Sequence, residues 1–116
     1  MKNNKQNSDN IDHFNVLRKI QNNPDASQRE LARELGFSLG KLNYCMSALK
    51  SKGLVKVNNF KMSKNKLNYI YILTPKGIVQ KTKLTIKFMQ QRMKDYDELQ
   101  EELNRENKIK NFKLNR

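Results

Sequence analysis

Cysteine and histidine each occur only once in this 116-residue chain, as Cys45 and His13. A single cysteine excludes an intramolecular disulfide and, beside a single histidine, any Cys/His zinc site. The sequence also has no Gly-rich phosphate loop and no nucleophile elbow, which are motifs of nucleotide-binding and hydrolytic enzymes. We therefore expect no metal, no cofactor and no catalytic residues, and an enzyme is the least favoured class of function.

Long apolar runs are missing as well. No segment approaches the roughly 18 residues that cross a bilayer, and the polar N-terminus MKNNKQNSDN lacks the apolar core of a signal peptide. We expect no membrane association and a cytoplasmic location. Glycine, with 4 residues, and proline, with 2, are also scarce, and this scarcity predicts mostly regular secondary structure with short connections.

Acidic residues are absent from one long stretch of the chain. Residues 36–94 hold 13 of the 24 Lys and Arg and none of the 11 Asp and Glu, so the rest of the chain is neutral. The whole formal charge of +13 therefore lies in this continuous segment. Such a concentration of positive charge indicates a polyanionic partner.

The N-terminal part of the chain predicts one helix after a polar tail. Residues 1–8 are Asn-rich and should be disordered. Ser8 or Asp9 can cap a helix that ends before Pro24, because the residue preceding a proline avoids the helical region. Apolar residues at three- and four-residue spacing predict its inner face, made by Ile11, Phe14, Val16, Leu17 and Ile20.

A helix-turn-helix pattern follows. Ser27 and Glu30 form a capping box at the start of a short second helix, and Gly36 can end that helix in a left-handed conformation. Two residues later, Ser38 can cap a third helix over residues 39–52. Two short helices joined by a three-residue turn with glycine are typical of a helix-turn-helix.

Beyond residue 53 the apolar period changes from 3.6 to 2. Residues 54–57 and 68–73 are expected to be strands, and the polar, basic segment 58–67 the extended tip of a hairpin. Thr74 can then cap a helix with Pro75 at its first position, where the missing amide costs nothing.

The predicted fold class is mainly α with a small β-hairpin. It is a winged helix-turn-helix of αααββ order over residues 9–74, followed by a long C-terminal helix over 75–108 that serves dimerisation. A frayed basic tail completes the chain at 109–116.

The third helix is the predicted reading element. Its buried stripe should consist of Leu42, Cys45, Met46 and Leu49, so that Cys45 acts as a small apolar side chain rather than as a redox sensor. The second helix of a helix-turn-helix lies in the major groove and reads bases with its N-terminal residues. The opposite face therefore supplies the candidate base-reading residues, Ser38, Gly40, Lys41, Asn43, Tyr44 and Ser47.

Each of these residue types suits a particular contact. Lys41 can donate to guanine O6 and N7, and Asn43 can pair with adenine N6 and N7. Tyr44 can contact a thymine methyl group or a phosphate, and Gly40 permits close approach of the backbone. The alternative is an ordinary solvated helix face, which the preceding capped helix and the absence of acidic residues make less favoured.

Contacts to the DNA backbone are predicted from the end of this helix and from the hairpin tip. Lysines and short hydrogen-bonding side chains suit phosphate or minor-groove contact and add affinity rather than specificity. The alternative is a hairpin that only increases solubility. The candidate backbone-contacting residues are Lys50, Lys61, Ser63, Lys64, Asn65 and Lys66.

The C-terminal helix predicts a homodimer. Met89, Tyr96 and Leu103 recur every seven residues with Leu99 between them, which is a short coiled-coil pattern. The candidate interface residues are Phe88, Met89, Met93, Tyr96, Leu99 and Leu103. A two-fold dimer would bind double-stranded DNA at a palindromic or pseudo-palindromic site. The alternative is a helix that folds back on its own domain.

The segments SQRELARELG (27–36) and SLGKLNYC (38–45) resemble the MarR-type winged-helix regulators, and most closely the subgroup associated with exopolysaccharide genes. The segments KGLVKV (52–57), SKNKL (63–67) and LTPKGI (73–78) are also similar. The resemblance covers about residues 11–99 and implies a DNA-binding transcriptional regulator of polysaccharide-related genes.

Two features depart from ordinary MarR proteins. The Asp-x-Arg motif of their wing is replaced by residues 61–66, and the extra N-terminal helix that helps to build their dimer and ligand pocket is absent. The second departure argues against a small-molecule effector. Two other functions stay open, a general nucleic-acid or RNA-binding module and a protein-interaction adaptor.

Overall fold

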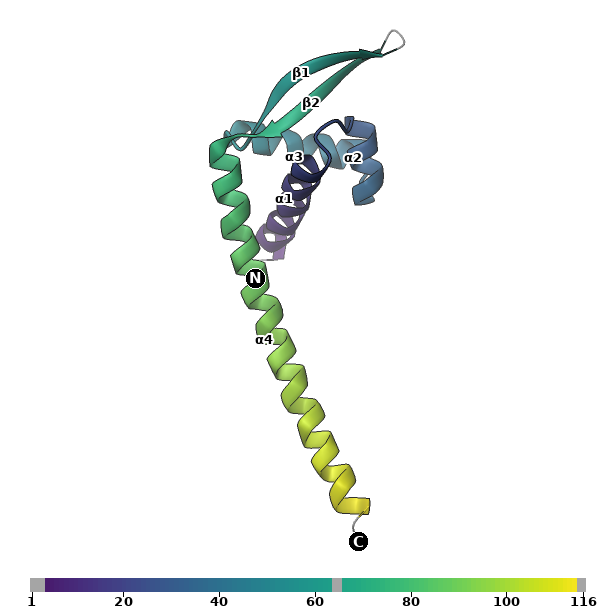
Figure 1. The fold of residues 1–116 in the computed structure, drawn as a ribbon, viewed down its shortest axis with the longest axis vertical. Coiled ribbons are helices and arrows are strands. Elements are labelled where there is room, and N and C mark those ends of the chain that lie inside the picture. The colour runs from purple at the N-terminus through teal and green to yellow at the C-terminus, as the bar shows by residue number, and fades with distance from the viewer. Residues whose placement is uncertain (1–3, 64–65, 115–116) are drawn as a thin grey trace. The chain divides into compact units, whose positions relative to one another are not determined.

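The computed structural model describes residues 4–63 and 66–114 of the chain. Its elements follow the order α1 (Asn4–Asn22), α2 (Gln28–Leu35), α3 (Leu39–Ser51), β1 (Val55–Ser63), β2 (Lys66–Leu73) and α4 (Pro75–Leu114) (Figure 1). This order confirms the expected fold class, a mainly helical winged helix-turn-helix with a two-stranded hairpin and a long C-terminal helix. The chain forms two units, the first ending at Leu84 and the second beginning at Thr85.

The core of the first unit lies where α1, α2 and α3 meet. Val16, Leu17, Leu31, Leu42 and Leu49 are almost completely buried there. Two polar links join the elements at its edge: Gln28 donates to the Tyr71 hydroxyl over 3.0 Å, and Asn23 donates to Glu34 over 3.2 Å. The first link connects α2 to β2, and the second connects the residue after α1 to α2. Val55 of β1 and Tyr71 of β2 are buried as well, so the hairpin contributes to the core.

The capping residues position the two short helices as expected. The Glu30 amide donates to the Ser27 hydroxyl over 3.2 Å, and that hydroxyl donates to the Glu30 carboxylate over the same distance. Gly36 ends α2 with φ +72°, and the Phe37 amide donates to the carbonyl of Ala32 over 2.8 Å. Because the left-handed conformation favours glycine, the chain turns sharply here and α3 starts three residues later.

The first helix differs from its prediction in two respects. It begins at Asn4 rather than at Ser8 or Asp9, because no glycine or proline interrupts the polar residues ahead of the expected cap. Within it, Ile11 is 45% exposed while His13 is only 7% exposed. The spacing of apolar residues predicted Ile11 on the buried face of this helix. In the structure the helix instead turns the edge that carries His13 toward the core.

The hairpin is paired over a longer length than predicted. β1 and β2 are antiparallel from Val55 opposite Leu73 to Ser63 opposite Lys66, with a register irregularity between Val57 and Asn59. The expectation of an extended tip over 58–67 is therefore wrong. Polar side chains do not prevent pairing, because the backbone supplies the hydrogen bonds of the ladder. The two strands run side by side away from the helices in Figure 1.

A close contact joins the hairpin to α4. The Thr74 hydroxyl accepts from the Gly77 amide over 3.0 Å and donates to the Gly53 carbonyl over 2.6 Å. A Cβ atom added to Gly77 would lie 2.0 Å from the Leu54 carbonyl oxygen. Only glycine therefore fits in this first turn of α4, and the residues after α3 are held against the start of α4.

The long C-terminal helix extends further than predicted. It continues to Leu114, beyond residue 108, because no helix-breaking residue occurs in its basic end. Within the second unit, every described side chain from Met89 to residue 111 is exposed. The apolar side chains there reach large exposed fractions, such as 62% for Met93 and 65% for Tyr96.

Candidate nucleic-acid interface

The outer face of α3 carries the candidate base-reading residues. Leu42, Cys45, Met46 and Leu49 are at most 2% exposed, so the predicted buried stripe is confirmed. The remaining face is open to solvent, with Tyr44 57% exposed. The structure brings the six candidates together on or next to this face, and all are exposed: Ser38, Gly40, Lys41, Asn43, Tyr44 and Ser47. Lys50, one turn further along, is exposed as well.

Ser38 has a structural function at the start of this helix. Its hydroxyl accepts a hydrogen bond from the Lys41 amide over 3.1 Å, which satisfies one of the free donors of the first turn. The Ser38 side chain is therefore already engaged in the helix cap. At Gly40, two residues later, no atom beyond the neighbouring residues and the backbone of its own helix lies within 4 Å of the position that a Cβ would take. The surface beside Gly40 is thus open to a close approach of another molecule.

Lys41 is held from two sides. Its Nζ lies 3.3 Å from an Asp12 carboxylate oxygen on α1 and 4.2 Å from the centre of the Phe37 ring. The Lys41 side chain is nevertheless 47% exposed, whereas the Asp12 side chain is only 19% exposed. The ammonium group is thus oriented at the N-terminal end of α3 by an acidic neighbour that competes with any phosphate or guanine for it.

The single cysteine faces the core below this surface. Cys45 is 2% exposed. Burial, followed by the charge of Asp12, raises the pKa of its thiol above the usual range. Since the thiolate is the reactive form of cysteine, both effects keep this thiol inert.

The wing candidates fall largely beyond what the structure describes. Lys64 and Asn65 lie outside the described residues. Lys61 and Ser63 belong to β1 and Lys66 belongs to β2, but their side chains are likewise outside the described part. Their proposed contacts with the DNA backbone therefore stay predictions from the sequence.

Two arginines on α2 were missed by the sequence reasoning. Arg29 and Arg33 are exposed and stand four residues apart, so they share one face of the helix. They line a shallow hollow together with Ala32, Phe37 and Leu39, beside the turn that leads into α3. The first helix of a helix-turn-helix crosses the DNA backbone, and guanidinium groups suit phosphate contacts. The four-residue spacing of the two arginines after the capping box could have predicted this shared face from the sequence.

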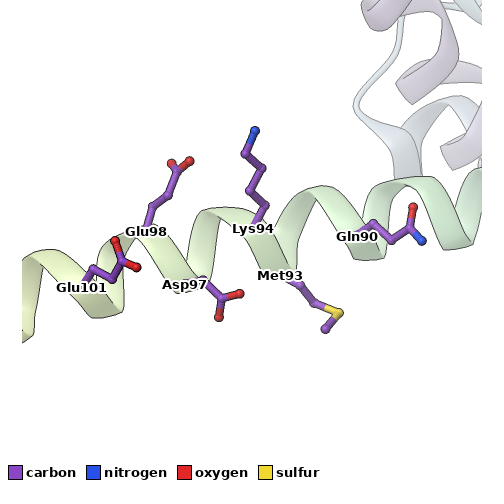
Figure 2. Close-up of a pocket in the computed structure, with 6 residues that line it drawn as sticks. All are labelled: Gln90, Met93, Lys94, Asp97, Glu98 and Glu101. Carbon is purple, nitrogen blue, oxygen red and sulfur yellow. The ribbon is translucent and has the colours of Figure 1, made fainter.

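The candidate dimer residues lie in the second unit, on α4. Met89, Met93, Tyr96, Leu99 and Leu103 are between 53% and 65% exposed, while Phe88 is half-buried. Figure 2 shows Met93 and Asp97 on one side of the helix and Lys94 and Glu98 on the other. The apolar side chains therefore form a solvent-facing strip with charged residues beside it.

Among the described residues, no group of three or more His, Cys, Asp or Glu side chains could hold a metal ion. None of the helices in the described ranges has the length and apolar character to span a membrane.

Comparison with known proteins identifies the domain. The winged helix-turn-helix DNA-binding family matches residues 13–56, from the middle of α1 into β1. This domain is a winged helix-turn-helix. No curated protein matches the chain significantly in sequence.

Solved structures extend the similarity beyond this domain. A MarR protein of Staphylococcus aureus, solved with salicylate and kanamycin, is 20% identical with a TM-score of 0.60, over 90% of this chain and 73% of that one. A Staphylococcus aureus MepR–DNA complex is 17% identical with a TM-score of 0.57, over 76% of this chain and 60% of that one. At these identities the likeness establishes a shared fold.

A third structure contains DNA as well. Streptococcus pneumoniae FabT in complex with DNA is 22% identical with a TM-score of 0.52, over 73% of this chain and 59% of that one. The chain thus spans about three fifths of the length of the MepR and FabT chains. The fold of this protein is shared with MarR-type regulators.

Proposed function

We propose that this protein is a sequence-specific, DNA-binding transcriptional regulator of the MarR type that acts in the cytoplasm as a homodimer. The observation that carries the proposal is the outer face of α3, on which polar and basic side chains surround an open glycine above a fully buried apolar stripe. The match of residues 13–56 to a DNA-binding family and the solved DNA complexes of MepR and FabT support it.

In the proposed complex α3 lies in the major groove. Asn43 offers both a donor and an acceptor to an adenine edge, and Tyr44 offers an aromatic ring with a hydroxyl group. Lys50 and the two arginines of α2 would contact phosphates on either side of the groove. The lysines of the wing would add further phosphate contacts, which increase affinity for any sequence.

The homodimer part of the proposal depends on α4. A solvent-facing strip of large apolar side chains is costly for a monomer, and a second copy can cover it. Two winged helices related by a two-fold axis would bind a palindromic or pseudo-palindromic duplex, with half-sites separated by a whole number of duplex turns.

The target genes follow only from the sequence resemblance described above. We propose that they concern extracellular or surface polysaccharide, because the segments at 38–45 and 63–67 are most similar to that subgroup. Mapping the bound sites on the chromosome of the source organism tests this part. Sites without any polysaccharide-related gene nearby would contradict it without affecting the proposal of DNA binding.

Selection of bound duplexes from a random pool tests DNA binding itself. We expect an enriched sequence with two-fold symmetry, and an N43A variant that loses preference at one position of each half-site. A K50A variant is the matched control, because a phosphate contact should weaken all sequences alike. Competition by random single strands as effective as by the selected duplex would instead favour the RNA-binding alternative. A heteromeric complex without duplex affinity would favour the adaptor.

A further inference from the structure

Six apolar side chains of α4 form a strip along the second unit, which we call the seam. Its members are separated by three or four residues and are 51% to 65% exposed: Ile86, Met89, Met93, Tyr96, Leu99 and Leu103. This spacing is the one that lets two helices pack side by side over several turns. The spacing of the seam indicates a partner helix. It does not by itself show whether that helix runs parallel or antiparallel to α4.

The seam is nearly symmetric about its own midpoint. If α4 is reversed about the point between Lys94 and Asp95, Ile86 coincides with Leu103 and Met93 coincides with Tyr96. In an antiparallel pair these residues would lie at the same level on facing helices and fill the same layers. Met89 coincides with Gln100 and Leu99 coincides with Gln90, so each of these two layers is half apolar.

The charges change sign at the same midpoint. Residues 85–94 contain Lys87, Arg92 and Lys94 and no acidic residue. Residues 95–104 contain Asp95, Asp97, Glu98, Glu101 and Glu102 and no basic residue. The midpoint of the apolar pattern and the boundary of the charge pattern therefore coincide.

We infer that two copies of α4 pair antiparallel through the seam, with the two-fold axis between Lys94 and Asp95. In this arrangement the segment 85–94, with three positive charges, faces the segment 95–104 of the other copy, with five negative charges. A parallel pair in register would place each segment against its own like charge. This inference rests on the homodimer of the proposed function but not on its DNA binding.

Disulfide cross-linking of the full chain tests the direction. The variants I86C and L103C are made in a C45A background, so that each protein carries a single thiol. In an antiparallel pair, residue 86 lies about 25 Å from its own counterpart, since 17 residues of helix separate the two levels. Each single variant should therefore stay unlinked under oxidation, because a disulfide needs Cβ atoms about 4 Å apart.

A mixture of the two variants should give a cross-linked dimer that contains one chain of each. A parallel pair would instead cross-link each single variant with itself and would overturn the inference. Absence of any cross-link, both in the mixture and in each single variant, would also overturn the inference. The experiment needs no DNA, so loss of duplex binding by the wild-type protein would refute the regulator and leave the pairing untouched.

Neutralising the acidic segment gives a second and independent readout. The variant E101Q/E102Q removes charges that an antiparallel partner attracts, so its dimer dissociation constant should rise about tenfold at low salt. In a parallel pair the same change removes repulsion and should tighten the dimer, which would contradict the inference. The matched control N104Q/N107Q changes no charge and should leave the dissociation constant unaltered in sedimentation equilibrium.

Discussion

The ammonium of Lys41 lies 3.3 Å from the carboxylate of Asp12, so an ion pair joins the first turn of α3 to α1. The same ammonium covers the Phe37 ring in the turn before α3. This arrangement orients Lys41 in the absence of other partners. In the proposed complex, DNA would have to share the ammonium with this acidic residue.

Replacing Asp12 by asparagine should therefore tighten duplex binding several-fold, because the Lys41 charge is then free to approach the DNA. Fluorescence anisotropy at several salt concentrations measures the change. In a K41M background, which retains the apolar stem over Phe37, D12N should have a clearly smaller effect. An equal gain in both backgrounds would show that Asp12 acts by general repulsion and that Lys41 does not contact DNA.

Substitutions of Ser38 can separate an effect on protein stability from an effect on duplex binding. S38A should lower the free energy of unfolding by about 1 kcal/mol, because the Lys41 amide loses its acceptor. S38D and S38N both restore a cap, but only aspartate adds a negative charge beside the DNA. Chemical denaturation and anisotropy should show that S38D is stable and binds duplex weakly, with S38N as its neutral control. Equal affinities of S38D and S38N would place this residue away from the DNA.

Two glycines should respond to alanine in opposite ways. G77A forces a Cβ to within 2.0 Å of the Leu54 carbonyl oxygen, and we expect it to destabilise the protein by about 3 kcal/mol through overpacking. G40A meets no atom within 4 Å and should stabilise α3 by about 1 kcal/mol. Thermal unfolding measures both changes. A G77A protein as stable as wild type would contradict the close contact between Leu54, just before β1, and α4.

His13 should make stability depend on pH. Its Nε2 is buried and has no hydrogen-bond partner among the described residues, and it lines a cavity of about 230 Å³ with Leu17, Lys52 and Leu84. Burial, followed by the charge of Lys52, lowers the pKa of the imidazole below its usual 6.5. The unfolded chain therefore takes up a proton at higher pH than the folded protein.

The resulting stability is present above pH 6.5 and is lost as the pH falls from 6.5 through the lower pKa of the folded state. Tm measured between pH 7.5 and 5 should fall more steeply for the wild type than for an H13Q variant. The comparison removes the contribution of the carboxylates, which titrate alike in both proteins. Parallel curves would mean that His13 is not buried in its neutral form.

Local signals explain which parts of the fold could be predicted. The residues at the helix ends act through hydrogen bonds or backbone conformations within a few residues, as at Ser27, Gly36, Ser38 and Thr74. The types of these residues were therefore enough to predict where the helices begin or end. The buried stripe of α3 followed from helical spacing in the same way. The length of the hairpin was not predicted, because lysine and asparagine dominate residues 58–66 and the pairing there depends on backbone hydrogen bonds.

Features that depend on distant contacts were missed. The burial of His13 requires α1 to turn that edge toward the residues after α3 and toward α4, and the close approach of Gly77 requires the Leu54 carbonyl. The pairing of Lys41 with Asp12 joins residues 29 positions apart. The exposed face of α3 was predictable, but the neighbours that orient its side chains were not.

The most direct test of the proposed function compares the affinity of the protein for a selected palindromic duplex with its affinity for a scrambled duplex. Both affinities are measured from about 50 to 200 mM salt. If the dimer neutralises about 6–10 phosphates, the affinity for both duplexes should fall by about 10³–10⁵ over this range. The selected duplex should stay the tighter ligand throughout, because the base contacts of α3 carry no counterion release. Equal affinity for the two duplexes at every salt concentration would contradict a sequence-specific regulator.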